Sequence, residues 1–362
     1  MVNHYTLNDV KESSKRKLFN VVSLFAGGGG SSTGYRLAGG DVLAINEFIP
    51  AAQECYAKNY PDTHIFKGDV RELTAEAILD KINLKKGELD ILDGSPPCSA
   101  FSLAGIREKG WGKEKSYSST TQVVDDLFFE YARILKDIQP KVFVAENVKG
   151  LTIGQPKNLL GSSQMGLFGE HKNTIYHTLV DCGYRVRYKV VNAADYGVPQ
   201  NRERIIFIGV RRDICAKISY PPAFNYKVSV GEAIHDLEPD VFNPLSPTLE
   251  RIWDDLRLGE PTHSYGIRTG DKMGGTQRSK TFKDTPSRTI TCTPEVFHYQ
   301  DRRTLAINEL KRICGFPDDY YTGTSFNKSW ERLGRAVPPL MMKAIAEHIY
   351  NTILKNSRHG ND

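Results

Sequence analysis

The sequence predicts an α/β protein with a doubly wound, mostly parallel sheet and a second, smaller domain. Short, continuously apolar runs alternate with stretches of helical spacing through residues 18–215, as is typical of strands covered by helices on both faces. Glycine-rich or polar residues follow several of these runs. Ligands of doubly wound sheets bind at the carboxyl ends of the strands, so we expect the functional site at that edge.

Each element follows from its local pattern. Apolar runs ended by glycine or acidic residues predict strands, and apolar residues recurring every three or four positions predict helices. The predicted strands are residues 18–26, 41–46, 89–92, 142–145 and 204–210. The predicted helices are residues 31–38, 50–59, 125–138, 230–237, 249–258 and 337–354.

Composition shifts divide the chain into four segments. Tyr220 and the two prolines after it mark a boundary, beyond which helical spacing weakens. Residues 99–121 and 150–173 are rich in glycine and polar residues, so we expect a mobile loop and a surface insertion. The predicted segments are a flexible tail (1–17), the sheet domain (18–215), a loop-rich second domain (216–300) and a return to the sheet domain (301–362).

The composition excludes several classes of protein. The chain has 362 residues, a net charge of +5 and six cysteines. These cysteines form no CxxC pair or zinc-ligand spacing, and no apolar run approaches the roughly 18 residues of a membrane span. Residues 1–20 lack the apolar core of a secretory signal. We therefore expect a reduced, cytoplasmic, metal-free protein that does not enter a membrane, with a charge compatible with a polyanionic partner.

A glycine-rich turn follows the first predicted strand. Residues 25–30 read FAGGGG and open a helix, so a ligand can approach the backbone and anionic groups are favoured there. A plain tight turn would explain the glycines equally well. Glu47 ends the next strand, where a carboxylate accepts hydrogen bonds from ribose hydroxyls in nucleotide sites. Together they favour an adenosine-containing cofactor.

Cys98 ends the segment GSPPC at residues 94–98, directly after a predicted strand. A cysteine chosen at random is more often a small buried hydrophobe than a nucleophile. Here two prolines stiffen the chain before the thiol, and the strand end places it at the active edge of the sheet. This context favours a nucleophilic thiolate.

An acidic side chain and two arginines end the set. Glu146 ends an apolar strand, where a carboxylate is costly unless it is paired or used. Gln200, Arg202 and Arg204 alternate at the entry to another strand, so they project to one face. The guanidinium groups of the two arginines can hold a carboxylate, a phosphate or a base carbonyl. The alternative interpretation is a structural role, in which salt bridges hold the start of the strand.

With these residues in order, the sequence resembles the DNA (cytosine-5)-methyltransferases of bacteria and phages. Nine motifs match that family in sequence and order across nearly the whole chain, and the variable stretch before Arg288 is where the family keeps its target-recognition region. The motifs are residues 25–30 (FAGGGG), Glu47, 68–69 (GD), 94–98 (GSPPC), 126–128 (DLF), 146–148 (ENV), 200–204 (QNRER), 287–291 (SRTIT) and 334–338 (GRAVP).

The resemblance implies a Rossmann-like methyltransferase fold that binds S-adenosylmethionine and no metal. Residues 18–215 would form the catalytic domain and 216–300 the target-recognition domain. Glu47 would bind the ribose and Asp69 the adenine amino group. The residues implied to bind the cofactor are Phe25, Ala26, Gly27, Gly29, Glu47, Phe48, Asp69, Val70, Pro96, Leu127 and Arg335.

The resemblance also implies the chemistry. Cys98 would attack carbon 6 of a flipped-out cytosine, and Glu146 would donate to ring nitrogen 3. Arg204 would hold the base carbonyl while Arg202 steadies the site around Glu146. Carbon 5 would then take the methyl group before the thiol leaves. The residues expected to contact DNA phosphates are Arg107, Lys109, Arg268, Lys272, Arg278 and Lys280.

Three positions depart from the family. Ser23 replaces a common Asp and Ser99 a common Gln, and both exchanges are compatible with the chemistry. Arg335 replaces the usual Asn beside the cofactor, where a guanidinium is unfavourable near a sulfonium. Arg335 can turn to solvent or a local acid, approach the cofactor carboxylate, or pair with the extra carboxylate of carboxy-S-adenosylmethionine, which would give 5-carboxymethylcytosine.

Two other functions compete with DNA methylation. One branch of the family modifies tRNA, and a catalytically silent DNA-binding homologue would keep the fold alone. Intact Cys98, Glu146, Arg202 and Arg204 argue against the silent homologue, and the GSPPC and ENV segments argue against a dinucleotide-dependent oxidoreductase. We expect a monomer that acts on double-stranded DNA, in restriction-modification with a cognate endonuclease or in self-protection.

Overall fold

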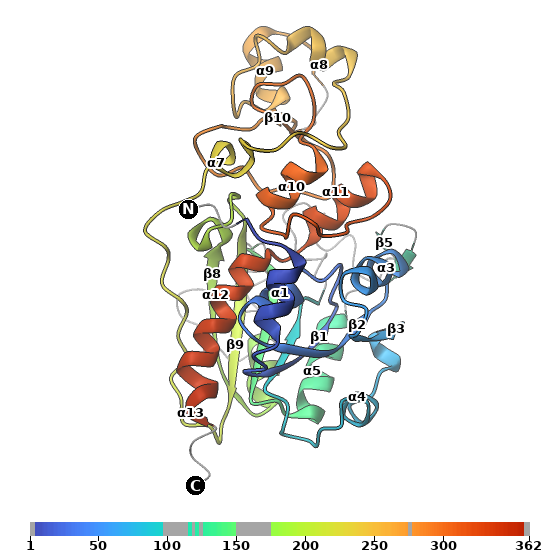
Figure 1. Ribbon diagram of the computed structural model, residues 1–362, viewed down its shortest axis with the longest axis vertical. Helices are drawn as coiled ribbons and strands as arrows, with labels where there is room; N and C mark the ends of the chain where they lie inside the picture. Colours follow the sequence, from blue (N-terminus) through green and yellow to red (C-terminus); the bar gives the residue numbers. More distant parts are fainter. Residues whose placement is uncertain are drawn as a thin grey trace. The chain divides into compact units, whose positions relative to one another are not determined.

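A seven-stranded sheet forms the centre of the larger part of the chain (Figure 1). The computed structural model describes residues 4–96, 115–117, 120–122, 126–149, 175–273 and 277–357. The strand order is β3-β2-β1-β4-β7-β9-β8. The strands are β1 (Asn20–Leu24), β2 (Asp41–Glu47), β3 (His64–Lys67), β4 (Ile91–Gly94), β7 (Val142–Val148), β8 (Tyr184–Asn192) and β9 (Glu203–Arg211), with a separate antiparallel pair of β5 (Lys115–Tyr117) and β6 (Thr120–Gln122).

The direction of the strands gathers the polar segments at one edge. Strands β3, β2, β1, β4 and β7 pair in parallel, whereas β9 runs antiparallel to β7. The carboxyl ends of β1, β2, β4 and β7 therefore meet at the same edge. This arrangement confirms the predicted mixed α/β fold with a mostly parallel sheet.

Helices cover both faces of this sheet. Side chains of α4, α5 and α6 share one apolar cluster with Leu24 of β1 and Phe143 of β7. Leu92 of β4 also belongs to this cluster, and the next residue, Asp93, points to the opposite face because successive residues of a strand alternate. The Tyr35 hydroxyl of α2 donates to Asp93, so α2 covers that other face. The helices of this part are α2 (Gly30–Leu37), α3 (Pro50–Asn59), α4 (Ala75–Ile82), α5 (Leu127–Ile138) and α6 (Ile175–Asp181), with 3₁₀ turns η1 (Val70–Glu72) and η4 (Ala193–Tyr196).

One glycine of the sheet is required by a close approach. A Cβ on Gly94, the last residue of β4, would lie 2.5 Å from the ring of Tyr131 in α5. The Tyr131 hydroxyl donates to the carbonyl groups of Leu92 and Val144, so the ring is held in place from both neighbouring strands. The end of β4 can therefore pack closely against α5 only with glycine there.

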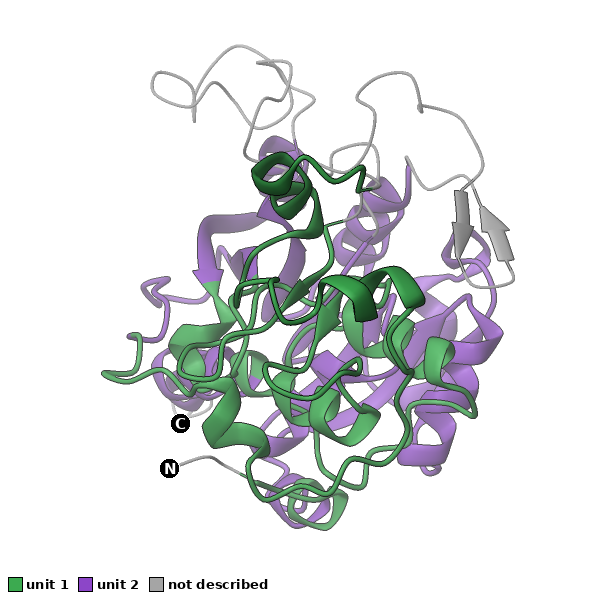
Figure 2. Ribbon diagram, turned by 90° about the horizontal axis from the view of Figure 1, so that it is seen from above, with its two compact units in different colours: residues 1–10, 192–202, 223–342 green, residues 11–191, 203–222, 343–362 purple. Residues whose placement is uncertain are grey.

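The chain forms two compact units (Figure 2). The larger unit comprises residues 11–191, 203–222 and 343–362, and the smaller unit residues 1–10, 192–202 and 223–342. Part of the smaller unit packs around Trp253, with Leu249 and Ile252 of α8, Tyr265 of α9 and Phe297 of β11. The remaining elements are α1 (Leu7–Ser14), α7 (Val230–Ile234), α8 (Pro247–Ile252), α9 (Thr262–Thr269), β10 (Ser279–Lys280), β11 (Val296–Phe297), α10 (Ile307–Ile313), α11 (Phe326–Arg335), α12 (Pro339–Ile349), the π-helical turn η5 (Tyr350–Leu354) and α13 (Lys355–Ser357).

Three features differ from the sequence-based expectations. Residues 7–14, expected in a flexible tail, form α1 and bury Val10. Strand β8 was not predicted, because its alternating exposure dilutes the apolar signal of a buried strand. Residues 301–342, expected with the sheet domain, belong to the smaller unit, where Asn308 hydrogen-bonds Asp240.

Candidate active site

The glycine turn between β1 and α2 has a left-handed backbone at several positions. The φ angles are 56° at Phe25, 57° at Gly27 and 96° at Gly29. A Cβ added to Gly27 would meet no atom within 4 Å. The turn therefore borders open space, as a backbone that receives a ligand must.

Glu47 is held directly beside this turn. Its Oε2 accepts a hydrogen bond from the Gly27 backbone N–H at 2.7 Å, and its Oε1 accepts one from the Ile49 N–H at 2.7 Å. The side chain is buried, whereas Phe48 is half-buried. Two backbone donors thus fix the orientation of the carboxylate beside the turn.

Asp69 lies at the end of the segment after β3 and is paired with an arginine that we did not predict. Arg71 donates from its backbone N–H and its Nη1 to the Asp69 carboxylate, at 3.0 and 2.8 Å. The same guanidinium also donates to Asp126. This hydrogen bond raises the pKa of Arg71 and lowers the pKa of the Asp126 carboxyl. A Cβ on Gly68 would also meet open space, so a second open stretch of backbone borders these charges.

Three other residues expected to bind the cofactor are buried. Val70 and Leu127 belong to the apolar cluster under the sheet, and Ala26 is buried in the glycine turn. Their side chains pack against the protein, so any contact with a cofactor would come from the backbone or the edge of the side chain.

The segment that leads to Cys98 is tied to β7. Pro96 is buried, and its carbonyl accepts a hydrogen bond from Asn147 Nδ2 at 3.0 Å. Gly94 pairs with Ala145 in the parallel register of β4 and β7. Cys98 itself lies outside the described residues, but the chain two positions before it is bonded to the residue after Glu146.

Glu146 and Arg204 form an ion pair across β7 and β9. Arg204 Nε lies 2.8 Å from Glu146 Oε1. The antiparallel register places Arg204 opposite Val148, so the pair is a diagonal contact on one face of the sheet. Glu146 is 8% exposed, and burial lowers the pKa of Arg204 against the opposing effect of the carboxylate.

The contact with Glu146 that we expected from Arg202 is thus made by Arg204. Arg202 is buried in the smaller unit, and its Nη1 donates to the Ile290 carbonyl at 3.0 Å. Gln200 accepts from the Ile290 N–H at 3.0 Å. Gln200 and Arg202 therefore hold the backbone N–H and C=O of Ile290 in the SRTIT segment, and these contacts join two motifs far apart in sequence.

Comparison with known proteins decides the family. The model of the C-5 cytosine-specific DNA methylase family matches residues 19–351. The chain belongs to this family. It is therefore a DNA cytosine-5 methyltransferase, as the sequence motifs predicted.

Curated and structural relatives agree with this assignment. The methyltransferase is 31% identical to the Type II methyltransferase M1.HphI of Haemophilus parahaemolyticus, over 91% of this chain and 86% of that one. It is 32% identical to M.PspPI of Psychrobacter sp. (strain TA137), over 91% and 79%. The structure of a prophage-encoded protein described as a DNA modification methyltransferase (E. coli) has a TM-score of 0.71 and 22% identity, over 92% of this chain and 99% of that one, so it supports the fold.

Two of the three departures of this methyltransferase have visible partners. The Ser23 hydroxyl donates to the carboxylate of Asp93, a buried residue of β4. Arg335 bonds Glu331, four residues earlier in α11, at 2.9 Å. Arg335 therefore contacts a local acid, which was one of the three roles considered. Ser99 lies outside the described residues.

The residues expected to contact DNA differ in accessibility. Lys272 is exposed, and Arg278 is half-buried. Arg268 bonds Glu260 at 2.8 Å, whereas Lys280 is only 8% exposed and lies over the Trp253 ring. In this conformation Lys280 packs within the smaller unit and does not reach a phosphate. Arg107 and Lys109 lie outside the described residues.

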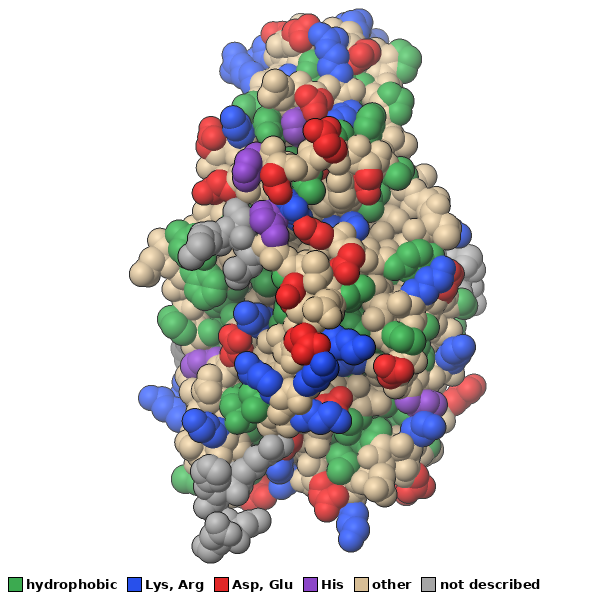
Figure 3. Space-filling view, viewed as in Figure 1, with side chains coloured by type: hydrophobic (Ala, Val, Ile, Leu, Met, Phe, Trp, Pro, Cys, Tyr) green, Lys and Arg blue, Asp and Glu red, His purple; other side chains and the backbone are tan. Residues whose placement is uncertain are grey.

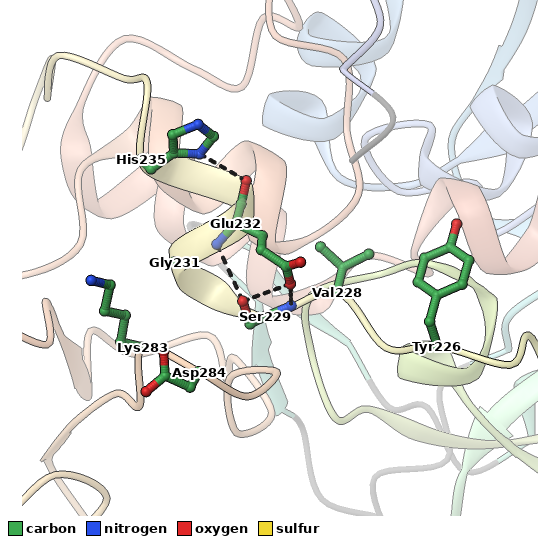
Figure 4. Close-up of a pocket in the computed structure, with 8 residues that line it drawn as sticks. All are labelled: Tyr226, Val228, Ser229, Gly231, Glu232, His235, Lys283 and Asp284. Carbon is green, nitrogen blue, oxygen red and sulfur yellow. Dashed lines mark hydrogen bonds between the residues drawn. The ribbon is translucent and has the colours of Figure 1, made fainter. Parts of the chain in front are cut away.

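Among the described residues, a cavity in the smaller unit is a further candidate for a site, but its Glu232 caps a helix. One face of the chain carries basic and acidic side chains interspersed (Figure 3). A cavity of about 490 Å³ in the smaller unit is lined by Ser229, Glu232 and Lys283 among others (Figure 4). The Glu232 carboxylate bonds Ser229 Oγ and N–H and lowers its own pKa through these bonds. It therefore caps helix α7 and is occupied in that role.

The described part of the chain has neither a metal-binding cluster nor a membrane-spanning helix. Within it, no group of three or more His, Cys, Asp or Glu side chains is arranged to hold a metal ion. No helix in the same residues is long and apolar enough to cross a bilayer.

Proposed function

We propose that the protein transfers a methyl group from S-adenosylmethionine to carbon 5 of a flipped-out cytosine in a specific DNA sequence, through a covalent Cys98 adduct. The observation that carries this proposal is the Glu146–Arg204 pair at the carboxyl edge of the sheet. Asn147 bonds the segment that leads to Cys98. The acid of β7, the guanidinium group of β9 and the segment that leads from β4 to Cys98 are therefore contributed by neighbouring strands.

The carboxyl edge of the sheet has the groups that the cofactor requires. Open space borders Gly27 and Gly68, and the fixed Glu47 carboxylate lies beside the turn. Glu47 would hold the ribose, and Asp69 would accept from the adenine amino group while Arg71 orients it. S-adenosylmethionine supplies an electrophilic methyl group when it is bound.

The residues of this chain would activate the base in a defined order. The Cys98 thiolate forms a bond to carbon 6 while protonated Glu146 donates to nitrogen 3, which makes carbon 5 nucleophilic. After methylation, a base removes the carbon-5 proton, the bond to sulfur breaks, and the thiolate leaves. Arg204 would hold Glu146 at Oε1 and leave Oε2 for the cytosine ring.

Covalent trapping tests this mechanism. Duplex DNA that contains 5-fluorodeoxycytidine at the target site cannot lose a proton from carbon 5, so the adduct should accumulate and shift on a denaturing gel. We expect trapping by the wild type and none by Cys98→Ser. Bisulfite sequencing of DNA from an expressing host identifies the target site. A folded wild type that neither traps DNA nor methylates the host genome would contradict the proposal.

The Arg335–Glu331 pair supports ordinary S-adenosylmethionine as the donor, because the guanidinium already has an anionic partner. Mass spectrometry of DNA from hosts that contain both donors should detect 5-methylcytosine alone with the wild type and with Arg335→Asn. Detection of 5-carboxymethylcytosine with the wild type only would establish the carboxylated donor instead.

We also propose that the substrate is double-stranded DNA and that the enzyme acts as a cytoplasmic monomer beside a cognate endonuclease, with residues 216–300 reading the target. The support is that the curated relatives are named Type II methyltransferases. Duplex DNA should be methylated and tRNA should not. Light scattering should give a mass near 40.6 kDa.

A further inference from the structure

A single buried carboxylate bonds residues on both sides of the glycine turn. Asp93 in β4 is 1% exposed. Its Oδ2 accepts from Ser23 Oγ at 2.7 Å and from Ser31 Oγ at 2.8 Å, and its Oδ1 accepts from the Tyr35 hydroxyl at 3.1 Å. Ser23 lies before the turn and Ser31 after it, so one oxygen atom joins the two ends of the turn.

We propose that Asp93 is a positioning residue for the cofactor: its carboxylate fixes the glycine turn and thereby sets the affinity for S-adenosylmethionine and S-adenosylhomocysteine. This inference rests on the proposed binding of the cofactor at the turn. Asp93 also directly precedes Gly94, so the same side chain anchors the turn to the strand that leads to Cys98.

The backbone of the turn explains why an anchor is needed. Phe25 has a φ of 56° without being glycine, and Gly27 and Gly29 are also left-handed. Residues in this region are held there by their surroundings, because the isolated chain prefers other conformations. Hydrogen bonds at Ser23 and Ser31 restrain the chain on each side of these positions.

Ionisation of this buried carboxylate has a cost. Burial raises the pKa of Asp93 to about 6, although the three hydroxyl donors oppose this shift. The neighbouring Glu146 carboxylate contributes a smaller part of this rise. A folded-state pKa above the unfolded value means that this group's stabilisation is lost as the pH rises through about 6. Above that pH the charge destabilises the fold, yet it offers more acceptor sites than an amide would.

Calorimetric titration with S-adenosylhomocysteine and S-adenosylmethionine at pH 8 tests the proposal. We expect Asp93→Asn to raise both Kd values by about tenfold or more, the equivalent of one hydrogen bond to a charged group. Its kcat at saturating cofactor should stay within about threefold of the wild type, and its Tm should be unchanged or higher, since the buried charge is removed.

The strand register supplies a rescue variant. Ser23 and Asp93 are directly paired in β1 and β4. The double variant Ser23→Asp, Asp93→Ser returns a carboxylate to the same place from the neighbouring strand. We expect it to bind both ligands within about threefold of the wild type, because one carboxylate again faces Ser31 and Tyr35.

Asp90 provides a matched control. It is also 1% exposed and lies three residues earlier, but it bonds the Asn20 N–H at 3.0 Å and Lys141 at 2.8 Å at the amino end of β1. Asp90→Asn should lower the Tm and leave both Kd values unchanged.

Three outcomes would overturn the inference. The first is that folded Asp93→Asn binds S-adenosylhomocysteine and S-adenosylmethionine with unchanged Kd values. The second is that Asp93→Asn binds more weakly but the double variant Ser23→Asp, Asp93→Ser does not restore binding. The third is that Asp90→Asn loses as much affinity as Asp93→Asn. A wild type that binds neither ligand would instead remove the proposed function, and this result is separate because it precedes any comparison of variants.

Discussion

Two buried arginine–glutamate pairs, one in each compact unit, have different surroundings. Arg303 and Glu309 in the smaller unit form a two-pronged contact, with both guanidinium nitrogens 2.8 Å from the two carboxylate oxygens. Glu309 also accepts from the Ala306 N–H at 2.7 Å, and Arg303 bonds Asp301. Glu146 and Arg204 in the sheet meet at one carboxylate oxygen.

The difference separates a structural pair from a reactive one. Both carboxylate oxygens of Glu309 accept hydrogen bonds from donors of its own unit, which stabilises a buried charge. Within the described residues, Arg204 Nε pairs with Oε1 of Glu146, and no hydrogen bond reaches Oε2. A buried acid with an open oxygen can transfer a proton to a substrate, whereas a saturated one cannot.

The largest expected effect is on catalysis. Glu146→Gln removes the proton donor and keeps the volume of the side chain. We expect kcat/KM for DNA to fall by about 10²–10⁴-fold, measured by transfer of labelled methyl groups to duplex DNA. Retained binding of S-adenosylhomocysteine would show that the cofactor site is intact, and full activity in this variant would exclude Glu146 as the acid.

The substitution Glu309→Gln, in the Arg303–Glu309 pair, should lower the stability of the protein. Glu309→Gln leaves Arg303 buried beside a neutral amide, so the free energy of unfolding should fall by about 3–5 kcal/mol. Urea denaturation measures this loss. At a temperature where the variant is folded, kcat should match that of the wild type. A larger stability loss in Glu146→Gln than in Glu309→Gln would reverse the comparison.

His298, beside the Arg303–Glu309 pair, should make the stability of the smaller unit depend on pH. It accepts from the Asp301 N–H through Nδ1 at 2.9 Å, and burial lowers the pKa of His298 despite the nearby Glu309 and Asp301 carboxylates. A lowered histidine pKa means that stability is complete above the ordinary value and is lost as the pH falls below it. Denaturation at pH 8, 7, 6 and 5 should show this decline, with a shallower slope for His298→Gln.

The smallest effect is expected at an exposed pair. Arg335 and Glu331 are one helical turn apart in α11, where such pairs contribute about 0.3–0.5 kcal/mol. Arg335→Asn should therefore change the free energy of unfolding by no more than this amount, and 0.5 M salt should remove most of the difference. A loss of several kcal/mol would mean that Arg335 has a further structural contact.

The sequence by itself determined the elements and their chemistry. Apolar runs set β1, β2, β4, β7 and β9, and the residues that follow them had to meet at one edge because parallel strands share their direction. Glu47 and Glu146 were therefore predicted at this edge from their positions alone, and the structure places them in the carboxyl-terminal parts of β2 and β7. Local patterns can do this because the spacing of apolar residues and the position of glycine are encoded within short windows.

Only the tertiary structure decided which side chains meet. Strand register made Arg204 the partner of Glu146, and it paired Ser23 with Asp93. Packing buried Lys280 against Trp253, although its neighbours in sequence suggested a basic surface. These partners depend on registers and on contacts between residues far apart in the chain, and no local window of sequence contains them.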